Sequence, residues 1–226
     1  MTPRVLVRRN GPGHGLEQDL AATRNPGPPQ PIPAPPTDVS TVSNYRRPPD
    51  PPTVRLNMIT NFARQIETLS SPSGGDSFTF KSFTAADAYE LGHLLHARLL
   101  PLSATAPTLI SISLGSGGGV LFQAVVGSGT TPDNEVWVRR KRAAVLRFGR
   151  STWFLHCKYD GDEDQFRARM GLSPEKAAEY AIHGGGVPIR VGGVEGVVAV
   201  VVVSGLKQDQ DHAVIGSVIM ENWEYE

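Results

Sequence analysis

The sequence has a single cysteine and no net charge, and both features limit what the protein can be. Cys157 cannot form an intramolecular disulfide, and the usual thiolate-rich zinc sites are excluded. This fits a reducing compartment better than a secreted disulfide scaffold. The 22 Lys and Arg residues are balanced by 22 Asp and Glu residues, so bulk charge does not indicate nucleic acid or another strongly charged partner.

Long apolar runs are also missing. The longest, Val197 to Val203, is far too short to cross a bilayer, so we expect no membrane span. Arg4, Arg8 and Arg9 give the N-terminus the charge bias of a transit peptide. The prolines and glycines around them disfavour the amphipathic helix that a transit peptide needs. We therefore expect a cytoplasmic protein.

Proline, in contrast, is abundant and unevenly placed. Most of the 19 prolines precede Thr53, in a region with almost no apolar clustering. Such a region cannot bury enough surface to offset the entropy lost on ordering. We expect residues 1–52 to be a disordered Pro-rich arm that is available to a protein partner. Residues 53–226 have the size of one domain, and apolar spacing predicts that it begins with a helix from Val54 to Leu69.

Apolar segments that end in glycine-rich turns predict five strands. Gly115 to Gly119 and Gly192-Gly193 are the expected hairpin turns. Because hairpins join antiparallel neighbours, the pattern predicts an α+β fold with a mostly antiparallel sheet. The five strands are expected over residues 78–80, 108–114, 120–126, 187–191 and 197–203.

Capping residues indicate where helices begin. Thr84 and Asp87 form a capping-box pattern before a helix that continues to Leu99. Thr131 followed by Pro132 begins a second helix, which ends near Gly149. Residues 151–159 fit a helix or a strand, and we prefer the helix. Further helices are expected over residues 173–182 and 206–223.

His183 precedes three consecutive glycines, Gly184 to Gly186. Glycine can adopt positive φ and lets other groups approach the backbone closely, and a histidine beside it adds a titratable ring. This pattern fits either a binding site or a turn that only glycine can make. His-Gly-Gly-Gly also resembles the oxyanion loop of lipases. No Gly-x-Ser-x-Gly occurs in the sequence, which excludes that class of serine hydrolase.

Four consecutive basic residues, Arg139, Arg140, Lys141 and Arg142, lie in the second predicted helix, and Arg150 follows it. Successive helix residues are about 100° apart, so the four cannot share one solvated face. At least one should point toward protein, a neighbouring subunit or a bound anion. The alternatives are a surface helix with snorkelling side chains and a clamp for ligand carboxylates or phosphates.

Two further polar pairs allow more than one interpretation. His93 and His96 could share a metal, but neither a third ligand at fixed spacing nor a His-Glu-x-x-His motif accompanies them. Asp211 and His212 could form a proton relay, or Asp211 could stabilise the N-terminus of its helix. Because no catalytic constellation is recognisable, enzymatic activity of a haem-degrading or oxidoreductase-like kind is left open.

Three blocks of the sequence together resemble one family. The blocks are Gly129-Thr130-Thr131-Pro132-Asp133-Asn134 with Trp137, Arg140-Lys141-Arg142 and Arg147 to Ser151; His183 to Val191; and Val203 to Leu206 with Gln208, Asp211 and His212. They resemble the UPF0303 (DUF967) family, haem-degrading-like relatives of HbpS, GlcG and the PduO C-terminal domain. The resemblance extends over about Phe78 to Trp223.

The resemblance implies a profilin-like, three-layer α/β/α domain with a five-stranded antiparallel sheet. It also implies homo-oligomers in which dimers form rings, and haem or a related tetrapyrrole as cofactor. The alternative is a non-catalytic oligomeric scaffold, since one suggestion ties the eukaryotic branch to delivery of tail-anchored proteins. His183 would be a metal ligand or proton donor. The candidate ligand-binding residues are His183, Gly184, Gly185, Gly186, Arg139, Arg140, Lys141, Arg142, Arg150, Asp211 and His212.

Overall fold

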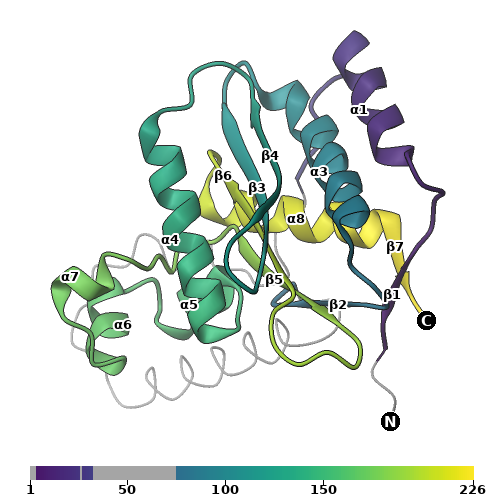
Figure 1. Cartoon of the computed structure of the whole chain (residues 1–226). Coiled ribbons are helices and arrows are strands. Elements are labelled where there is room, and N and C mark those ends of the chain that lie inside the picture. Colours follow the sequence, from purple (N-terminus) through teal and green to yellow (C-terminus); the bar gives the residue numbers. More distant parts are fainter. Residues whose placement is uncertain (1–3, 26, 33–74) are drawn as a thin grey trace, which may run out of the picture.

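A single mixed β-sheet organises the computed structural model, which describes residues 4–25, 27–32 and 75–226 (Figure 1). The sheet has seven strands in the order β4-β3-β6-β5-β2-β1-β7. Their bounds are β1 (Leu6–Arg8), β2 (Phe78–Phe80), β3 (Thr108–Leu114), β4 (Val120–Val126), β5 (Gly186–Val191), β6 (Ala199–Ser204) and β7 (Trp223–Tyr225).

The helices begin and end where their capping residues predict. Thr84 and Asp87 form a reciprocal capping box at the start of α3. The Asn134 side chain accepts a hydrogen bond from the Thr131 backbone N–H before α4, and Gly149 ends α4 with φ 64°. The bounds are α1 (His14–Arg24), α3 (Ala85–Leu99), α4 (Pro132–Phe148), α5 (Thr152–Lys158), α6 (Glu163–Arg169), α7 (Pro174–Ala177) and α8 (Gln208–Asn222), with a 3₁₀ turn at Leu100–Leu102.

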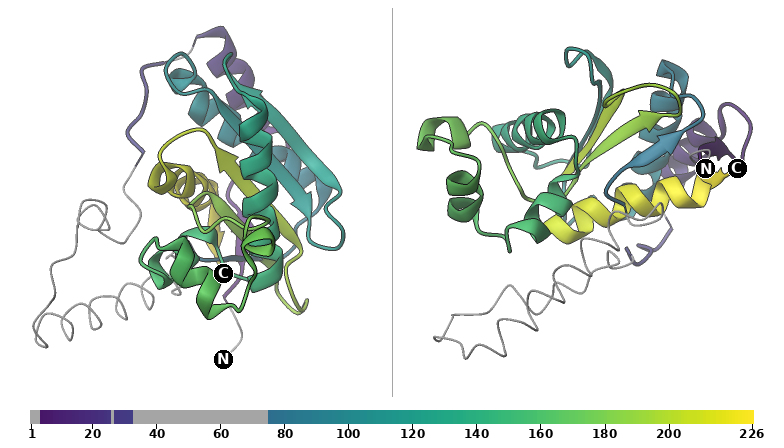
Figure 2. Two further views of the ribbon diagram at one scale, coloured as in Figure 1. Left: turned by 90° about the vertical axis from the view of Figure 1, so that its left-hand side faces the viewer. Right: turned by 90° about the horizontal axis from the view of Figure 1, so that it is seen from below.

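Helices cover both faces of the sheet (Figure 2). Val201 and Val203 of β6 pack with α3 and α8 in the larger core cluster. Val200 and Val202 of the same strand pack against α4 on the opposite face. This explains why the sequence of β6 is continuously apolar rather than alternating, since both of its faces are buried.

The expected five-stranded antiparallel sheet is wrong in two respects. The five predicted segments are strands, and β4-β3-β6-β5 pair antiparallel as expected. However, β2 pairs parallel with β5, and β1 adds a second parallel pairing with β2. The connection from β2 to β5 contains α3, the β3–β4 hairpin and α4 to α7, so it has the length that a parallel pair requires. The short strands β1 and β7 were not predicted, and the likeness to profilin remains a prediction.

The N-terminal region also differs from the expected disordered arm. Residues 6–8 and 14–24 form β1 and α1, and β1 pairs antiparallel with β7 (Figure 1). This segment is held largely by backbone pairing and polar contacts, which an analysis of apolar clustering does not detect. The helix expected over residues 54–69 lies outside the described residues.

Two details near the C-terminal half differ as well. The helix expected over residues 173–182 is limited to the four residues of α7, and α6 was not predicted. None of the helices in the described ranges has the length and apolarity needed to cross a bilayer.

Candidate functional site

The glycine loop that precedes β5 is closely packed on every side. Gly185 has φ +109°, and a Cβ added there would lie 2.5 Å from the Val203 carbonyl oxygen. A Cβ on Gly184 would overlap the backbone carbonyl of Gln208. The Gly186 backbone N–H donates to Thr152 Oγ1 at 2.9 Å. Glycine is therefore required here by conformation and by close approach, whether or not a ligand binds.

A buried ion pair lies directly beneath this loop. Lys141 Nζ donates to Asp211 Oδ2 at 2.9 Å and to the Val203 carbonyl at 3.0 Å. Asp211 Oδ1 accepts the Leu206 backbone N–H at 2.9 Å. Burial raises the pKa of Asp211, while Lys141 and the backbone N–H groups act in the opposite direction. The Lys141 side chain is only 3% exposed, so it supports the loop from inside.

Two histidines, the buried His212 and the partly buried His156, lie beside the Trp153 indole next to this pair. The His156 ring stacks on Trp153 at 4.9 Å with an interplanar angle of 8°, and His212 lies 6.1 Å away at 26°. Burial, with a smaller contribution from Lys141, lowers the pKa of His212 to about 3. Burial, followed by the nearby His183, lowers the pKa of His156 to about 4, against a weaker effect of Asp209. Both rings are therefore neutral at physiological pH.

We expect these histidines to make the fold acid-sensitive. In the folded state the pKa of His212 lies near 3, whereas its ordinary value is 6.5. The unfolded chain therefore binds more protons as pH falls from about 6.5, and stability falls with it. For His212 alone, the free energy of unfolding should drop by about 2 kcal/mol between pH 7.5 and pH 5.

Urea unfolding at both pH values measures this loss. His212→Phe should reduce the difference between the two pH values, because phenylalanine keeps an aromatic ring and removes the titrating group. Leu16→Phe, which introduces the same ring at an exposed position of α1 and removes no titrating group, should leave the difference unchanged. Equal pH dependence in His212→Phe and the unaltered chain would contradict the assignment.

His183 lies at the outer edge of this cluster. Its side chain is 38% exposed, and its ring packs edge-to-face on Trp137 at 4.8 Å. The Nδ1 atom is buried without a hydrogen-bond partner among the described residues, and Glu163 Oε1 lies 3.6 Å away. Burial lowers the pKa of His183, Glu163 raises it, and Lys141 and Arg140 lower it further. The net result is a neutral imidazole with an unsatisfied nitrogen.

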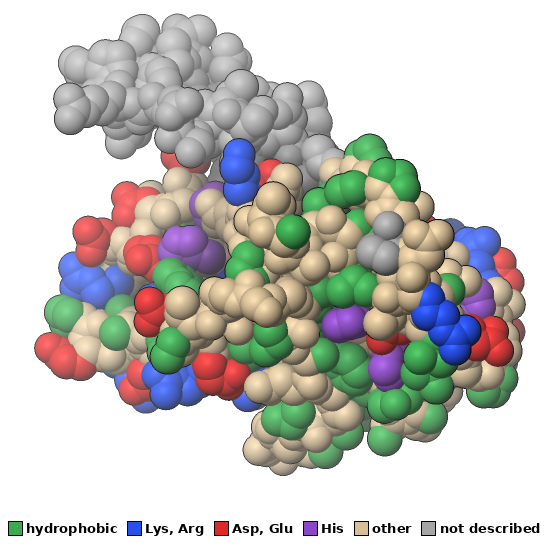
Figure 3. Space-filling model, turned by 90° about the horizontal axis from the view of Figure 1, so that it is seen from above, with side chains coloured by type: hydrophobic (Ala, Val, Ile, Leu, Met, Phe, Trp, Pro, Cys, Tyr) green, Lys and Arg blue, Asp and Glu red, His purple; other side chains and the backbone are tan. Residues whose placement is uncertain are grey.

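The basic residues of α4 point in different directions, as the helical spacing predicts. Lys141 points inward, and Arg139 is exposed. Arg140 donates to the Tyr180 carbonyl at 3.1 and 2.9 Å and stacks over Trp137. Arg142 donates to Ser111 Oγ on β3 at 2.7 Å. On the face shown in Figure 3, acidic and basic side chains are interspersed, as the zero net charge suggests.

The structure thus brings together only part of the predicted site. His183, the three glycines, Arg140, Lys141, Asp211 and His212 are connected through the contacts above. Arg142 lies against β3, and Arg150 pairs with buried Asp76 at 2.5 Å. The sequence reasoning missed Trp153, His156 and Glu163. The i, i+3 spacing of Trp153 and His156 on α5 is the one signal that could have indicated the stack.

The His93 and His96 pair has a partner that the sequence did not reveal. Both rings donate from Nδ1 to Asp19 of α1, at 2.6 and 2.5 Å. A shared carboxylate therefore explains this pair without a metal. Within the described ranges, no group of three or more His, Cys, Asp or Glu side chains could hold a metal ion. A metal role for His183 therefore remains a prediction that depends on a bound cofactor.

Residues 83–219 match the family described as haem degrading protein HbpS-like, so the chain belongs to that family of α+β proteins. Within it, the chain is a UPF0303 protein. A UPF0303 protein of Streptomyces avermitilis is 39% identical over 137 residues, which cover 61% of this chain and 78% of the relative.

Yeast provides both a sequence relative and a solved structure. The UPF0303 protein YBR137W of Saccharomyces cerevisiae is 35% identical over 136 residues, which cover 58% of this chain and 70% of the relative. The crystal structure of the Ybr137w protein superimposes with a TM-score of 0.61 at 30% identity, covering 75% of this chain and 93% of that one. The resemblance read from the three sequence blocks is therefore confirmed.

Proposed function

We propose that this protein binds haem or a related tetrapyrrole at the outer edge of the glycine loop, where His183 meets the ligand. Membership of the HbpS-like family supports a haem-related role. The observation that carries the proposal is the imidazole of His183, which is 38% exposed at the edge of the loop and whose pKa is lowered by burial. Neutral imidazole is the form that binds a metal.

The residues around His183 fit a flat, acidic cofactor. Trp137 packs edge-to-face with the imidazole, and the Arg140 guanidinium lies over the Trp137 indole. The exposed Arg139 is available for a ligand carboxylate, whereas Arg140 already donates to a backbone carbonyl. Bound haem would supply the redox chemistry of iron. The chain itself would orient the cofactor and, through His183 and Glu163, hold a proton beside it.

Self-association is part of the proposal, and the free edge of the sheet supports it. β4 ends the strand order, and among the described residues it pairs only with β3. Val120 and Val125 are 55% and 49% exposed, and the strand contains no charged residue. Native proteins usually protect a free edge with charge, proline or a covering element. An uncharged edge seven residues long therefore fits contact between copies of the chain.

Hemin titration of the full chain tests the proposal. We expect a saturable Soret shift near micromolar hemin, lost in His183→Ala and retained in His14→Ala, which removes a histidine from α1. Sedimentation monitored at the Soret band should show the haem moving with an oligomer. The proposal is wrong if no Soret shift saturates or if His183→Ala binds like the unaltered chain. A scaffold role in tail-anchored protein delivery remains the alternative prediction.

A further inference from the structure

One stripe of side chains on α3 contacts the N-terminal segment, residues 4–25. The stripe consists of Asp87, Glu90, His93 and His96, spaced three residues apart along the helix. Asp87 contacts Arg8, Glu90 contacts the start of α1, and the two histidines share Asp19. Polar side chains at such spacing lie along one side of a helix, where solvent would normally meet them. Here they meet another part of the chain.

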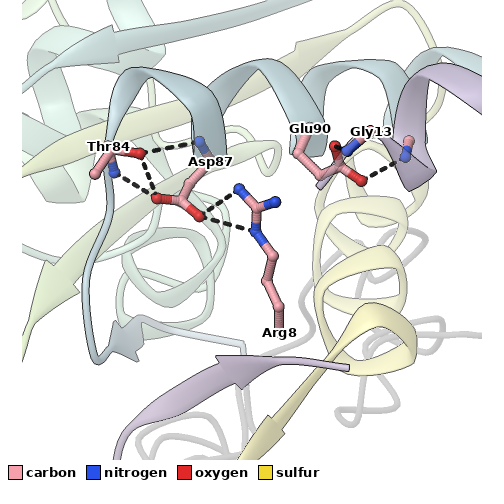
Figure 4. Close-up of polar contacts among 6 residues, drawn as sticks. Arg8, Gly13, Thr84, Asp87 and Glu90 are labelled. Carbon is pink, nitrogen blue, oxygen red and sulfur yellow. Dashed lines mark hydrogen bonds and ion pairs between the residues drawn. The ribbon is translucent and has the colours of Figure 1, made fainter. Parts of the chain in front are cut away.

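The first contact holds the end of β1. Arg8 donates from Nε and Nη2 to Asp87 Oδ1, at 2.9 and 2.6 Å (Figure 4). Burial would raise the pKa of Asp87, but hydrogen bonds from Thr84 and Arg8 outweigh it and the pKa is lowered. The same carboxylate therefore caps α3 and binds the segment. β1 is meanwhile inserted between β2 and β7.

The second contact caps α1 from outside the helix. No side chain of the segment caps its N-terminus. Instead, Glu90 of α3 accepts the backbone N–H groups of Gly13, at 3.1 Å, and of Gly15 (Figure 4). A Cβ on Gly15 would clash with the Glu90 backbone, so the close approach requires this glycine. The first turn of α1 therefore has its donors satisfied only while it lies on α3.

The third contact lies one turn into α1. Asp19, whose side chain is 12% exposed, accepts hydrogen bonds from His93 and His96. Together, the three contacts bind an arginine side chain at the end of a strand, two backbone N–H groups at the start of a helix, and a carboxylate one turn later. This is a specific pattern of recognition rather than general apolar packing.

The segment has little structure-forming capacity of its own. Leu6, Gly15 and Asp19 are its buried residues among those described. α1 has 11 residues, and isolated helices shorter than about 12 to 15 residues are marginal in water. The segment also precedes the family match, which begins at residue 83. A segment with these features depends on the rest of the domain for its order.

We propose that the surface of β2, β7 and the α3 stripe is a peptide-binding groove that this chain's own N-terminal segment occupies as a displaceable ligand. Its ligand class is a strand–glycine–helix peptide with the arginine and aspartate placed as in residues 4–25. This proposal is independent of haem binding, so each can fail without the other.

A cleavable form of the full chain tests the groove. A specific protease site is placed within residues 33–52, and the cut protein is challenged with a fluorescent synthetic peptide of residues 4–25. We expect the two pieces to stay together after cleavage and the labelled peptide to exchange in when added in excess. Uncut chain should take up much less label, because the attached segment competes at a high effective concentration.

Peptide variants identify the contacts. Asp19→Asn in the peptide should bind about 10- to 100-fold more weakly, because it loses charge-assisted hydrogen bonds. Glu17→Gln, an exposed change two residues away, should bind like the unaltered peptide. Equal binding of label to cut and uncut chain would place the peptide elsewhere. If release of the segment unfolds the remaining chain by circular dichroism, or if Asp19→Asn binds normally, the proposal is overturned.

Discussion

Replacing Gly185 with alanine is expected to lower the free energy of unfolding by about 3 to 5 kcal/mol, since backbone strain and overpacking add together. The residue has φ +109°, a conformation that side chains other than glycine's rarely adopt. The new Cβ would also lie 2.5 Å from the Val203 carbonyl and 2.7 Å from both Asp211 Cβ and Lys141 Nζ. These neighbours are backbone and a buried ion pair, so they cannot move aside cheaply.

Gly193→Ala is the matched control for this change. Gly193 also has positive φ, at +78°, but a Cβ there would meet no atom within 4 Å. Gly193→Ala should therefore lower the free energy of unfolding only by the backbone strain, about 1 kcal/mol. Urea unfolding of both variants measures the difference. Similar losses in the two variants would show that the loop is not tightly packed around Gly185.

Lys141→Met is expected to cost about 3 to 5 kcal/mol, because it leaves the Asp211 carboxylate charged and unpaired in the interior. Both side chains of the pair are almost fully buried, at 3% and 4% exposure. Arg139→Met changes the preceding residue of the same helix, which is exposed, and should stay within about 0.5 kcal/mol of the unaltered chain.

A double variant separates loss of the pair from loss of packing. Lys141→Met with Asp211→Asn removes both charges, and it should be more stable than Lys141→Met alone. Equilibrium unfolding of the four proteins gives the coupling between the two positions. If the free energy of unfolding of the double variant falls by the sum of the two single losses, the two groups do not interact in the folded protein.

The two hairpins, β3–β4 and β5–β6, could be inferred from sequence because their causes are local. The pairing of β3 with β6, which sets the order of the central strands, was not predicted. Val197 to Val203 is apolar at every position, and β6 is buried on both faces. The glycine-rich turns predicted the two hairpins. The helical spacing of Arg139 to Arg142 predicted an inward basic residue. It could not identify Lys141 as that residue, because Asp211 lies 70 positions away.

The features that the sequence did not predict depend on contacts between residues far apart in the chain. β1 and β7 have three residues each, too short for a periodic pattern, and each is stabilised by pairing with the other end of the chain. His93 and His96 gave a metal-like spacing, but their partner Asp19 lies 74 and 77 residues earlier. Glu163 meets His183 because α6 folds back onto α4, and no local pattern encodes that.

The N-terminal segment leads back to the end of α3. Arg98 there donates hydrogen bonds to the Gln30 side chain and to the Pro31 carbonyl. After residue 32 the described chain resumes at Gly75, and β2 then pairs with β5. The domain therefore holds the chain at two separate points, at residues 30–31 and at β2. Arg98→Ala would remove the first attachment and leave the second unchanged.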